Sequence, residues 1–297
     1  MSSIRGNWSL IATVALFLFL SVMGGIRYEG FLAPQVFLNL LIDNAFLLVV
    51  AVGMTFVILT GGIDLSVGAV VAFTTVLLAS LVQKHGWHPL PAMAFALALC
   101  TGFGAAMGLV IQRYKLLPFV VTLAGMFLAR GAATLISVES IGIDHPFLAS
   151  LAGQRIPLGG GASLSIGAVA GLVVAGIATL VARSTQFGRT VYAIGGSEVS
   201  AALMGLPLAK TLVRVYALSG FCAALAGLLY SLYTLSGYSL HATGLELDAI
   251  AAVVIGGTLL AGGVGHVPGT LVGVLVLGLI QTLISFDGTL SSWWTRI

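Results

Sequence analysis

Charged residues are scarce in this chain of 297 residues, because Lys, Arg, Asp and Glu together make up 7% of it. A soluble domain carries roughly 25% of these residues. Hydrophobic residues make up 59% of the chain, and the mean hydropathy is +1.14. These values exclude an ordinary soluble domain and predict a polytopic membrane protein. The apolar runs are longer than the roughly ten-residue strands of an outer-membrane barrel, so we expect helices to span the membrane.

Cysteine is nearly absent, and the sequence also lacks the common motifs of catalysis and metal binding. The two cysteines, Cys100 and Cys222, fall inside separate apolar runs, which is typical of packing residues. No Cys/His metal spacing, phosphate-binding loop, Rossmann glycine pattern or His-Glu-x-x-His motif occurs. We therefore expect no catalytic residues, no metal ligands and no cofactor bound by this chain. The basic residues are scattered, so the net charge of +3 indicates no nucleic-acid partner.

Nine apolar segments are predicted to span the membrane as helices. They are residues 8–25, 37–60, 65–83, 91–111, 117–137, 164–183, 213–235, 247–262 and 268–286. The first follows Arg5 and could be a signal peptide, but no small-x-small cleavage site follows it, which favours a retained span. No loop is long enough to fold on its own, so residues 1–297 are expected to form a single all-α transmembrane domain.

The distribution of Lys and Arg predicts the orientation of the spans. With the N-terminus in the cytoplasm, the inner loops carry Arg5, Arg113, Lys115, Arg183, Arg189, Lys210 and Arg214. The outer loops carry only Arg27, Lys84 and Arg155, so this orientation is favoured. Trp293 and Trp294 near the end are typical of an interfacial belt that precedes another helix. A tenth span that is missing from this sequence and a true nine-span protein are the two interpretations.

Two Gly-Gly pairs interrupt apolar runs, one in each half of the chain. Gly61 and Gly62 lie in ILTGGIDLSVG (residues 58–68), and Gly256 and Gly257 lie in VVIGGTLLAGG (residues 253–263). Interrupted segments in corresponding places are expected at a transport path built from an internal repeat. The alternative is close helix packing, for which glycine is also used in membranes. The motifs Gly104-x-x-x-Gly108 and Gly269-x-x-x-Gly273 fit that use.

Three polar residues near these interruptions are candidates for the translocation path. Asp64 follows the first Gly pair and is expected in a wet cavity or at the cytoplasmic mouth. Asp43 and Asn44 lie near the outer start of the second span. A charged side chain at the bilayer centre costs about 2.5–3.5 kcal/mol on insertion scales, so such residues face water or the protein interior. A satisfied interhelical hydrogen bond is the alternative for each of them.

Arg130 and several aromatic residues are further candidates. Arg130 lies in the outer half of the fifth span, where Glu139 could pair with it. Sugar recognition needs polar groups flanked by aromatic faces, which could be supplied by Phe127, Phe46, Tyr230, Tyr233 and Tyr238. Aromatic residues at helical spacing more often serve packing, and Glu246 and Asp248 at the start of the eighth span can equally cap a helix.

The cytoplasmic loop of residues 184–212 carries a predicted short helix over residues 198–204. Ser197 is placed to cap its N-terminus, and Gly205 followed by Pro207 ends it. A short helix on a basic loop suits docking of another protein. A helix that lies flat at the membrane interface is the alternative.

Four motifs resemble the ribose/branched-chain-amino-acid class of bacterial ABC importer permeases. They are TGGIDLSVG (60–68), LPFVVTLAG (117–125), FGRTVYAIGG (187–196) and ELDAIAAVVIGG (246–257). The motifs occur in the family's order and cover nearly the whole chain. Residues 281–296 are most similar to a galactofuranose permease subunit that works beside a second, related permease.

The resemblance implies a vitamin B12-permease-like (type II importer) helical bundle with an internal pseudo-repeat, in the bacterial inner membrane. Its partners would be an ATP-binding subunit that holds ATP and Mg²⁺, a periplasmic sugar-binding protein, a second permease (a paralogue or another copy) and membrane lipid. The ATPase would dock at Gly188, Arg189, Ala201, Ala202 and Gly205. The family normally has a further helix after the Trp-Trp stretch.

The sequence therefore predicts a permease subunit that imports a monosaccharide, with galactofuranose as the suggested sugar, and that hydrolyses no ATP itself. One alternative is a proton-coupled secondary transporter that uses Asp64 as the coupling carboxylate. An intramembrane enzyme is disfavoured because no nucleophile–base pair is visible.

Overall fold

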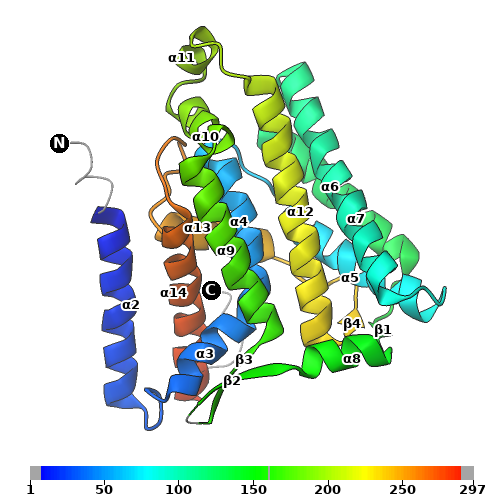
Figure 1. Ribbon diagram of the computed structural model, residues 1–297, viewed down its shortest axis with the longest axis vertical. Coiled ribbons are helices and arrows are strands. Elements are labelled where there is room, and N and C mark those ends of the chain that lie inside the picture. The colour runs from blue at the N-terminus through cyan, green and yellow to red at the C-terminus, as the bar shows by residue number, and fades with distance from the viewer. Residues whose placement is uncertain (1–7, 160, 289–297) are drawn as a thin grey trace.

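Apolar helices stand side by side along most of the protein (Figure 1). The computed structural model describes residues 8–159 and 161–288. Its helices are α2 (Trp8–Arg27), α3 (Pro34–Asp43), α4 (Ala45–Leu59), α5 (Val67–Gln83), α6 (Pro89–Tyr114), α7 (Pro118–Ile136), α8 (Pro146–Gly153), α9 (Ile166–Ser184), α10 (Gln186–Gly196), α11 (Glu198–Leu203), α12 (Leu208–Thr234), α13 (Leu245–Ile255) and α14 (Val267–Asp287). The strands are β1 (Ile141–Gly142), β2 (Arg155–Gly159), β3 (Ala162–Ser165) and β4 (Ser236–Gly237).

Six helices in the described part of the chain are long and apolar enough to cross a membrane. They are α2, α6, α7, α9, α12 and α14, and each matches one predicted span. The span predicted over residues 37–60 is broken instead, because α3 and α4 meet at Asn44 with a bend of 57°. Counted as one span, this bent pair raises the number to seven.

The remaining two predicted spans are shorter than expected. Helix α5 has 17 residues, and α13 has only 11. The prediction of a continuous span over 247–262 is wrong, because α13 ends at Ile255 and the backbone turns at Gly257, where φ is +90°. Among the described residues, fewer helices than the nine predicted spans are long enough to cross a membrane, so the prediction of nine full spans is not confirmed. Trp293 and Trp294, and the tenth span that they suggest, lie outside these residues.

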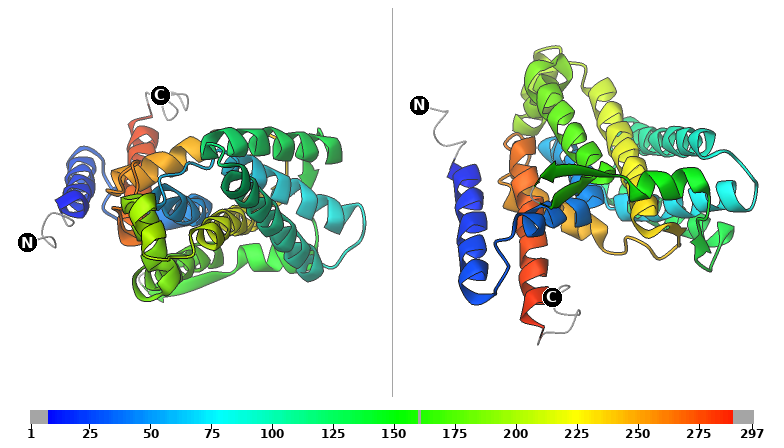
Figure 2. Two further views of the ribbon diagram at one scale, coloured as in Figure 1. Left: turned by 90° about the horizontal axis from the view of Figure 1, so that it is seen from above. Right: turned by 60° about the horizontal axis from the view of Figure 1, so that its bottom comes forward.

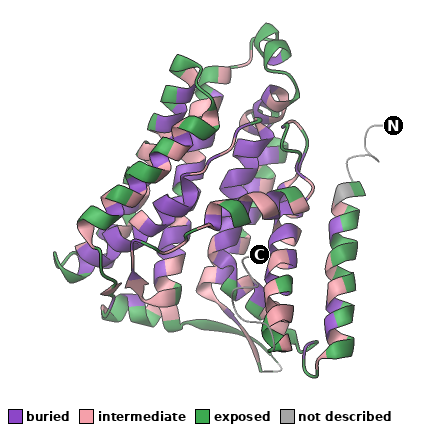
Figure 3. Ribbon diagram, turned by 180° about the vertical axis from the view of Figure 1, so that it is seen from behind, coloured by how far each residue is buried: buried purple, intermediate pink, exposed green. Residues whose placement is uncertain are grey.

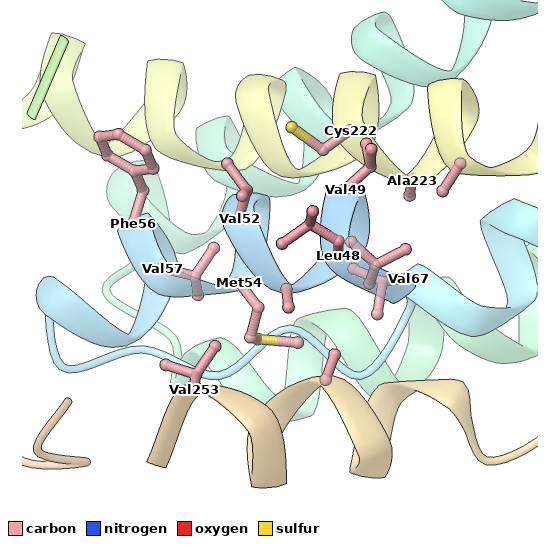
Figure 4. Packing of buried hydrophobic residues seen from close by; sticks show 14 of the residues in the cluster. Leu48, Val49, Val52, Met54, Phe56, Val57, Val67, Cys222, Ala223 and Val253 are labelled. Atoms are coloured by element: carbon pink, nitrogen blue, oxygen red, sulfur yellow. The ribbon is translucent and has the colours of Figure 1, made fainter. Parts of the chain in front are cut away.

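Helix α4 lies at the centre of the bundle, and all but one of its residues are buried (Figure 3). Figure 4 shows Cys222 and Ala223 of α12 on one side of α4 and Val253 of α13 on the other. The two cysteines are buried, as their apolar surroundings predict. A helix buried all round is hydrophobic all round, which explains why α4 has no polar stripe.

Glycines allow the backbones of neighbouring helices to approach closely, as the two Gly-x-x-x-Gly motifs predict. A Cβ atom on Gly104 would overlap the carbonyl oxygen of Tyr216, and one on Gly108 would lie 2.9 Å from the Cα of Val213. These contacts join α6 to α12. In the second motif, a Cβ on Gly273 would overlap the carbonyl oxygen of Ala252, which joins α14 to α13. Van der Waals packing through small residues is the usual means of helix association in lipid.

The two ends of the bundle differ in structure (Figures 1 and 2). One end carries α10 and α11, together with the end of α6 and the start of α12. The other end carries α8 and two small antiparallel ribbons, in which β1 pairs with β4 and β2 pairs with β3. The ribbons are a small departure from the predicted all-α fold. Of the basic residues assigned to inner loops from the sequence, those that the structure describes lie at the end with α10 and α11. They are Arg113, Lys115, Arg183, Arg189, Lys210 and Arg214.

Candidate functional site at the two glycine breaks

The two glycine-interrupted segments lie against each other, although about 190 residues separate them in sequence. The backbone N–H of Gly263 donates a hydrogen bond of 2.9 Å to the carbonyl of Leu59. A Cβ on Gly262 would lie 2.8 Å from the nitrogen of Gly61. Deeper in the bundle, the hydroxyls of Thr55 and Thr270 are 2.8 Å apart. The structure therefore joins the end of α4 to the loop between α13 and α14, and we call this contact the glycine junction.

Each glycine that the sequence singled out has a local structural requirement. Gly61 has a φ of +79° and Gly257 one of +90°, a left-handed conformation that favours glycine. A Cβ on Gly62 would overlap the hydroxyl of Tyr216, and one on Gly256 would overlap the backbone of Gly269. Close packing thus explains Gly62 and Gly256, whereas turning of the chain explains Gly61 and Gly257.

Asp64 lies in the loop after the first break and is fully buried. One carboxylate oxygen accepts hydrogen bonds from the backbone N–H (2.9 Å) and the hydroxyl (2.6 Å) of Ser66. The other oxygen accepts from the hydroxyl of Ser219 on α12 at 2.7 Å. The predicted wet cavity or cytoplasmic mouth is therefore wrong. Because charge-assisted hydrogen bonds stabilise a buried carboxylate, Asp64 anchors this loop to α12.

The short helix predicted over residues 198–204 is confirmed as α11. The hydroxyl of Ser197 accepts a hydrogen bond from the N–H of Ser200 at 3.2 Å, and Gly205 follows the helix with a φ of +72°. Apolar side chains on this helix are strongly exposed, with 72% of Val199 and 84% of Leu203 accessible. An apolar face without a cover fits contact with another protein or with the membrane surface, which are the two interpretations that the sequence left open.

The five predicted docking residues divide into exposed and buried ones. Arg189, Ala202 and Gly205 are exposed and available to a partner. Gly188 and Ala201 are buried. A Cβ on Gly188 would overlap the last turn of α9, so this glycine serves the tight connection between α9 and α10.

Helix α10 connects this surface to the glycine junction, which the sequence alone did not indicate. A Cβ on Gly195 would overlap both the carbonyl oxygen of Leu59 and the nitrogen of Gly263. The hydroxyl of Tyr192 donates to the carbonyl of Gly265 at 2.8 Å, and burial raises the pKa of this hydroxyl. The ring of Phe187 also stacks on Phe56 of α4, with centroids 5.9 Å apart. The α10–α11 segment therefore contacts both breaks directly.

Asp43 and Asn44 lie at the opposite end, beside a cavity of about 460 Å³ between α3, α12 and α14. The hydroxyl of Tyr233 donates to the carboxylate of Asp43 at 3.1 Å. Asn44 is buried and donates to the carbonyl of Leu40 at 2.9 Å. The structure thus separates this pair from the glycine junction. Phe127 lies on α7, where 66% of it is exposed.

Arg130 does not form the ion pair predicted with Glu139. Its Nη1 donates instead to the carbonyls of Ser239 (2.6 Å) and His241 (2.8 Å), in the loop before α13.

The carboxylate of Glu246 lies against Gly68, where a Cβ would overlap it. Glu246 does lie in the first turn of α13, where the helix dipole favours it. Two of the aromatic candidates, Tyr230 and Tyr238, pack against the ring of His241.

Sequence reasoning missed Tyr216, Ser219 and Gly195. Tyr216 and Ser219 are three residues apart and share one face of α12. The only feature of the sequence that could have indicated them is a pair of hydroxyl side chains in an otherwise apolar run. Gly195 lies in the quoted motif 187–196, but its contact with Leu59 depends on chain segments far apart in sequence.

Comparisons with known proteins identify the family of this chain. The family described as branched-chain amino acid transport system / permease component matches residues 36–297. The inner membrane ABC transporter permease protein YjfF of Escherichia coli K12 is 51% identical over 294 residues, which are 99% of this chain and 89% of that protein. No solved structure matches the chain.

Two further relatives carry substrate names. The fructose import permease FruG of Bifidobacterium longum is 38% identical over 97% of this chain and 86% of its own length. The ribose import permease RbsC of Bacillus subtilis is 36% identical over 92% of this chain and 84% of its own length. The chain therefore belongs to the permease family of the branched-chain amino acid transport systems, as one of its multi-pass, non-enzymatic ABC transporter permeases.

Proposed function

We propose that this chain is the permease subunit of an ABC importer that carries a monosaccharide across the bacterial inner membrane. The named substrates of FruG and RbsC support a sugar as cargo. Galactofuranose is the specific sugar that we propose, on the sequence of residues 281–296. In this proposal the end with α10 and α11 faces the cytoplasm, because basic residues gather at this end, and a cytoplasmic N-terminus is part of the same proposal.

The observation that carries the proposal is the contact of Gly195 with Leu59 and Gly263. An ATP-binding subunit docks on the exposed side of the α10–α11 segment, around Arg189, Ala202 and Gly205. Because α10 has no free space at the glycine junction, its displacement moves the ends of α4 and of the loop before α14 together. Closely packed interfaces transmit displacement rather than absorb it.

The remaining partners are a periplasmic sugar-binding protein, which supplies most of the substrate selectivity, and a second permease chain. A coupled proton transporter receives no support, since the carboxylate of Asp64 is fully buried and bound by Ser66 and Ser219. The cavity beside Asp43 and Tyr233 is the candidate for the entry side of the path.

The test is uptake by the complete transporter, purified from its native operon and reconstituted in liposomes with ATP. Leu203→Asp places a charge on the exposed face of α11 and is expected to abolish copurification of the ATPase and sugar uptake. Leu240→Asp is the matched control, because this leucine is 59% exposed but lies at the opposite end. ATPase binding that survives Leu203→Asp unchanged, or uptake by the permease alone, contradicts the proposal.

A further inference from the structure

The cavity of about 460 Å³ at the end opposite to α10 and α11 is open to a ligand. It lies between α3, the end of α12 and the end of α14, where α3 and α14 run close together (Figure 1). Its volume falls within the range of roughly 300–1,000 Å³ that small-molecule sites occupy. Tyr233 is 55% exposed and Asp43 is also exposed, so a molecule in the cavity reaches their polar groups directly.

The lining of this cavity is mostly polar, although α14 is long and apolar enough to span a membrane. Gln281 on α14 lines the cavity six residues, or about 9 Å, before Asp287. Asp287 is 3.7 Å from Arg27, and this ion pair marks the same end of α14 and α2. By contrast, a cavity of about 140 Å³ between α5, α6 and α7 is lined by apolar side chains. Because polar side chains at membrane depth face water or the protein interior, the first cavity suits a polar occupant.

Several polar groups in the cavity have hydrogen-bonding capacity to spare. The hydroxyl of Tyr233 donates to one oxygen of Asp43 at 3.1 Å and leaves the other oxygen free among the described residues. Asn44 is 7% exposed, and its amide nitrogen donates to the carbonyl of Leu40, but no described residue donates to its Oδ1. The side chain of Gln281 forms no hydrogen bond with the described residues. A ligand that supplies the missing partners is therefore stabilised here.

The chemistry of the lining favours a neutral ligand with several hydroxyl groups. Amides both donate and accept hydrogen bonds and a carboxylate accepts them, which matches hydroxyls in either role. Asp43 is the one charged side chain among the described residues that line the cavity, and it repels phosphorylated or carboxylated ligands. The rings of Tyr233 and of Phe286, which is 40% exposed, add apolar surface beside these groups. A few polar groups among aromatic walls are typical of small-molecule sites.

We propose that this cavity is a subsite of the transport path that binds a neutral sugar on the periplasmic side, through Asp43 and Gln281. The inference rests on the proposed import function and adds to it a location and two contact residues. Asn44 lies at the 57° bend between α3 and α4, so the subsite adjoins one end of α4, and the glycine junction at Leu59 adjoins the other. Because α4 is closely packed along its length, a shift at one end reaches the other, which links sugar binding to the docked ATPase.

Protection of a single cysteine from chemical labelling tests the subsite. Val36→Cys puts a thiol in the cavity wall, while the native Cys100 and Cys222 are each only 1% exposed. The transporter, reconstituted with its periplasmic side outward, is treated with a membrane-impermeant maleimide at increasing concentrations of ribose, fructose, galactose or galactofuranose, and labelling of this chain is followed by mass spectrometry. We expect the imported sugar to slow labelling at least fivefold. Ala33→Cys, an exposed neighbour outside the cavity, is expected to be labelled at an unchanged rate.

Asp43→Asn and Gln281→Leu then test the contact residues. Each weakens or removes one hydrogen bond to the sugar and is expected to raise the concentration for half-protection of Val36→Cys about five- to tenfold. The unfolding temperature without sugar is expected to stay unchanged, because an asparagine still accepts from Tyr233 and the side chain of Gln281 has no hydrogen bond to lose. Asp144→Asn, at an exposed aspartate of the same end, is the control and is expected to change neither value.

The outcomes separate this inference from the proposed function. A sugar that is imported but gives no protection of Val36→Cys overturns the subsite and leaves the import function intact. Equal protection of Ala33→Cys also overturns it, because this result indicates a general closure of the outer side. A Val36→Cys thiol that is labelled only in the isolated permease overturns it as well, since the second permease chain then fills the cavity.

The variants decide the contacts. Protection that neither Asp43→Asn nor Gln281→Leu weakens overturns the roles of these two side chains. If the complete transporter imports none of the sugars, the import function fails, and the subsite fails with it.

Discussion

Ser219 donates its hydroxyl to the carboxylate of Asp64 at 2.7 Å, across 155 residues of sequence. This contact ties the loop of the first glycine break to α12, the helix that also carries Tyr216. Ser219→Ala would leave a buried carboxylate oxygen without its donor. We expect a loss of roughly 1.5–3 kcal/mol of stability, seen as a lower unfolding temperature of the purified protein. Ser285→Ala, at an exposed serine, is expected to have no effect.

Asp64→Asn distinguishes two roles for Asp64: a structural one, in which it holds its loop against α12, and a functional one, in which it carries a proton. The amide keeps an acceptor oxygen for Ser66 and can donate to the hydroxyl of Ser219, but it carries no titratable proton. We expect ATP-driven uptake to persist in reconstituted vesicles with no added pH gradient. Loss of uptake, together with normal folding and normal ATPase binding, would instead support a coupling role for the carboxylate.

Gly195→Ala tests the contact between α10 and the glycine junction. The added Cβ would overlap Leu59 and Gly263, and small-to-large changes in packed sites cost typically 1–3 kcal/mol. We expect the ATPase still to copurify, because the exposed face of α11 is unchanged, while uptake falls at least tenfold. Gly196→Ala is the matched control, since a Cβ there meets no atom within 4 Å. Equal uptake by the two variants would refute coupling at this contact.

Gly108→Ala tests the packing of α6 on α12. Its Cβ would lie 2.9 Å from the Cα of Val213, so the two helices must separate. A loss of about 1–3 kcal/mol of stability is expected. Gly102→Ala on the same helix meets open space and is expected to be neutral or stabilising by about 0.5–1 kcal/mol. Thermal unfolding of both variants in the same detergent gives the comparison, and a Gly108 variant as stable as the parent would contradict it.

Arg130→Gln tests whether the hydrogen bonds of Arg130 hold the loop before α13 in place. The substitution removes the guanidinium that binds the carbonyls of Ser239 and His241, and a decrease of roughly 1.5–3 kcal/mol in stability is expected. Glu139→Gln is expected to be neutral, because the ion pair that sequence suggested does not form. Protease cleavage in the loop of residues 238–244 measures the loosening. Equal cleavage of the two variants would show that Arg130 does not hold this loop.

Local signals in the sequence determined much of the architecture. The scarcity of charge and the long apolar runs predict a helical membrane protein, and six long helices match the predicted spans. Ser197 and Gly205 mark the ends of α11 correctly, because capping depends on residues within one turn. The Gly pairs correctly indicate breaks at the end of α4 and at the end of α13, since a left-handed backbone favours glycine wherever it occurs.

Only the tertiary structure decided which groups meet. Sequence placed Asp64 near water and Arg130 beside Glu139, but Ser219 and the carbonyls of residues 239 and 241 bind them instead. The segment proposed to dock the ATPase meets both glycine breaks at Gly195, which no local pattern reveals. Periodicity and capping arise from neighbours in sequence, whereas the partner of a buried polar group is chosen by helix packing, and packing joins residues more than a hundred positions apart.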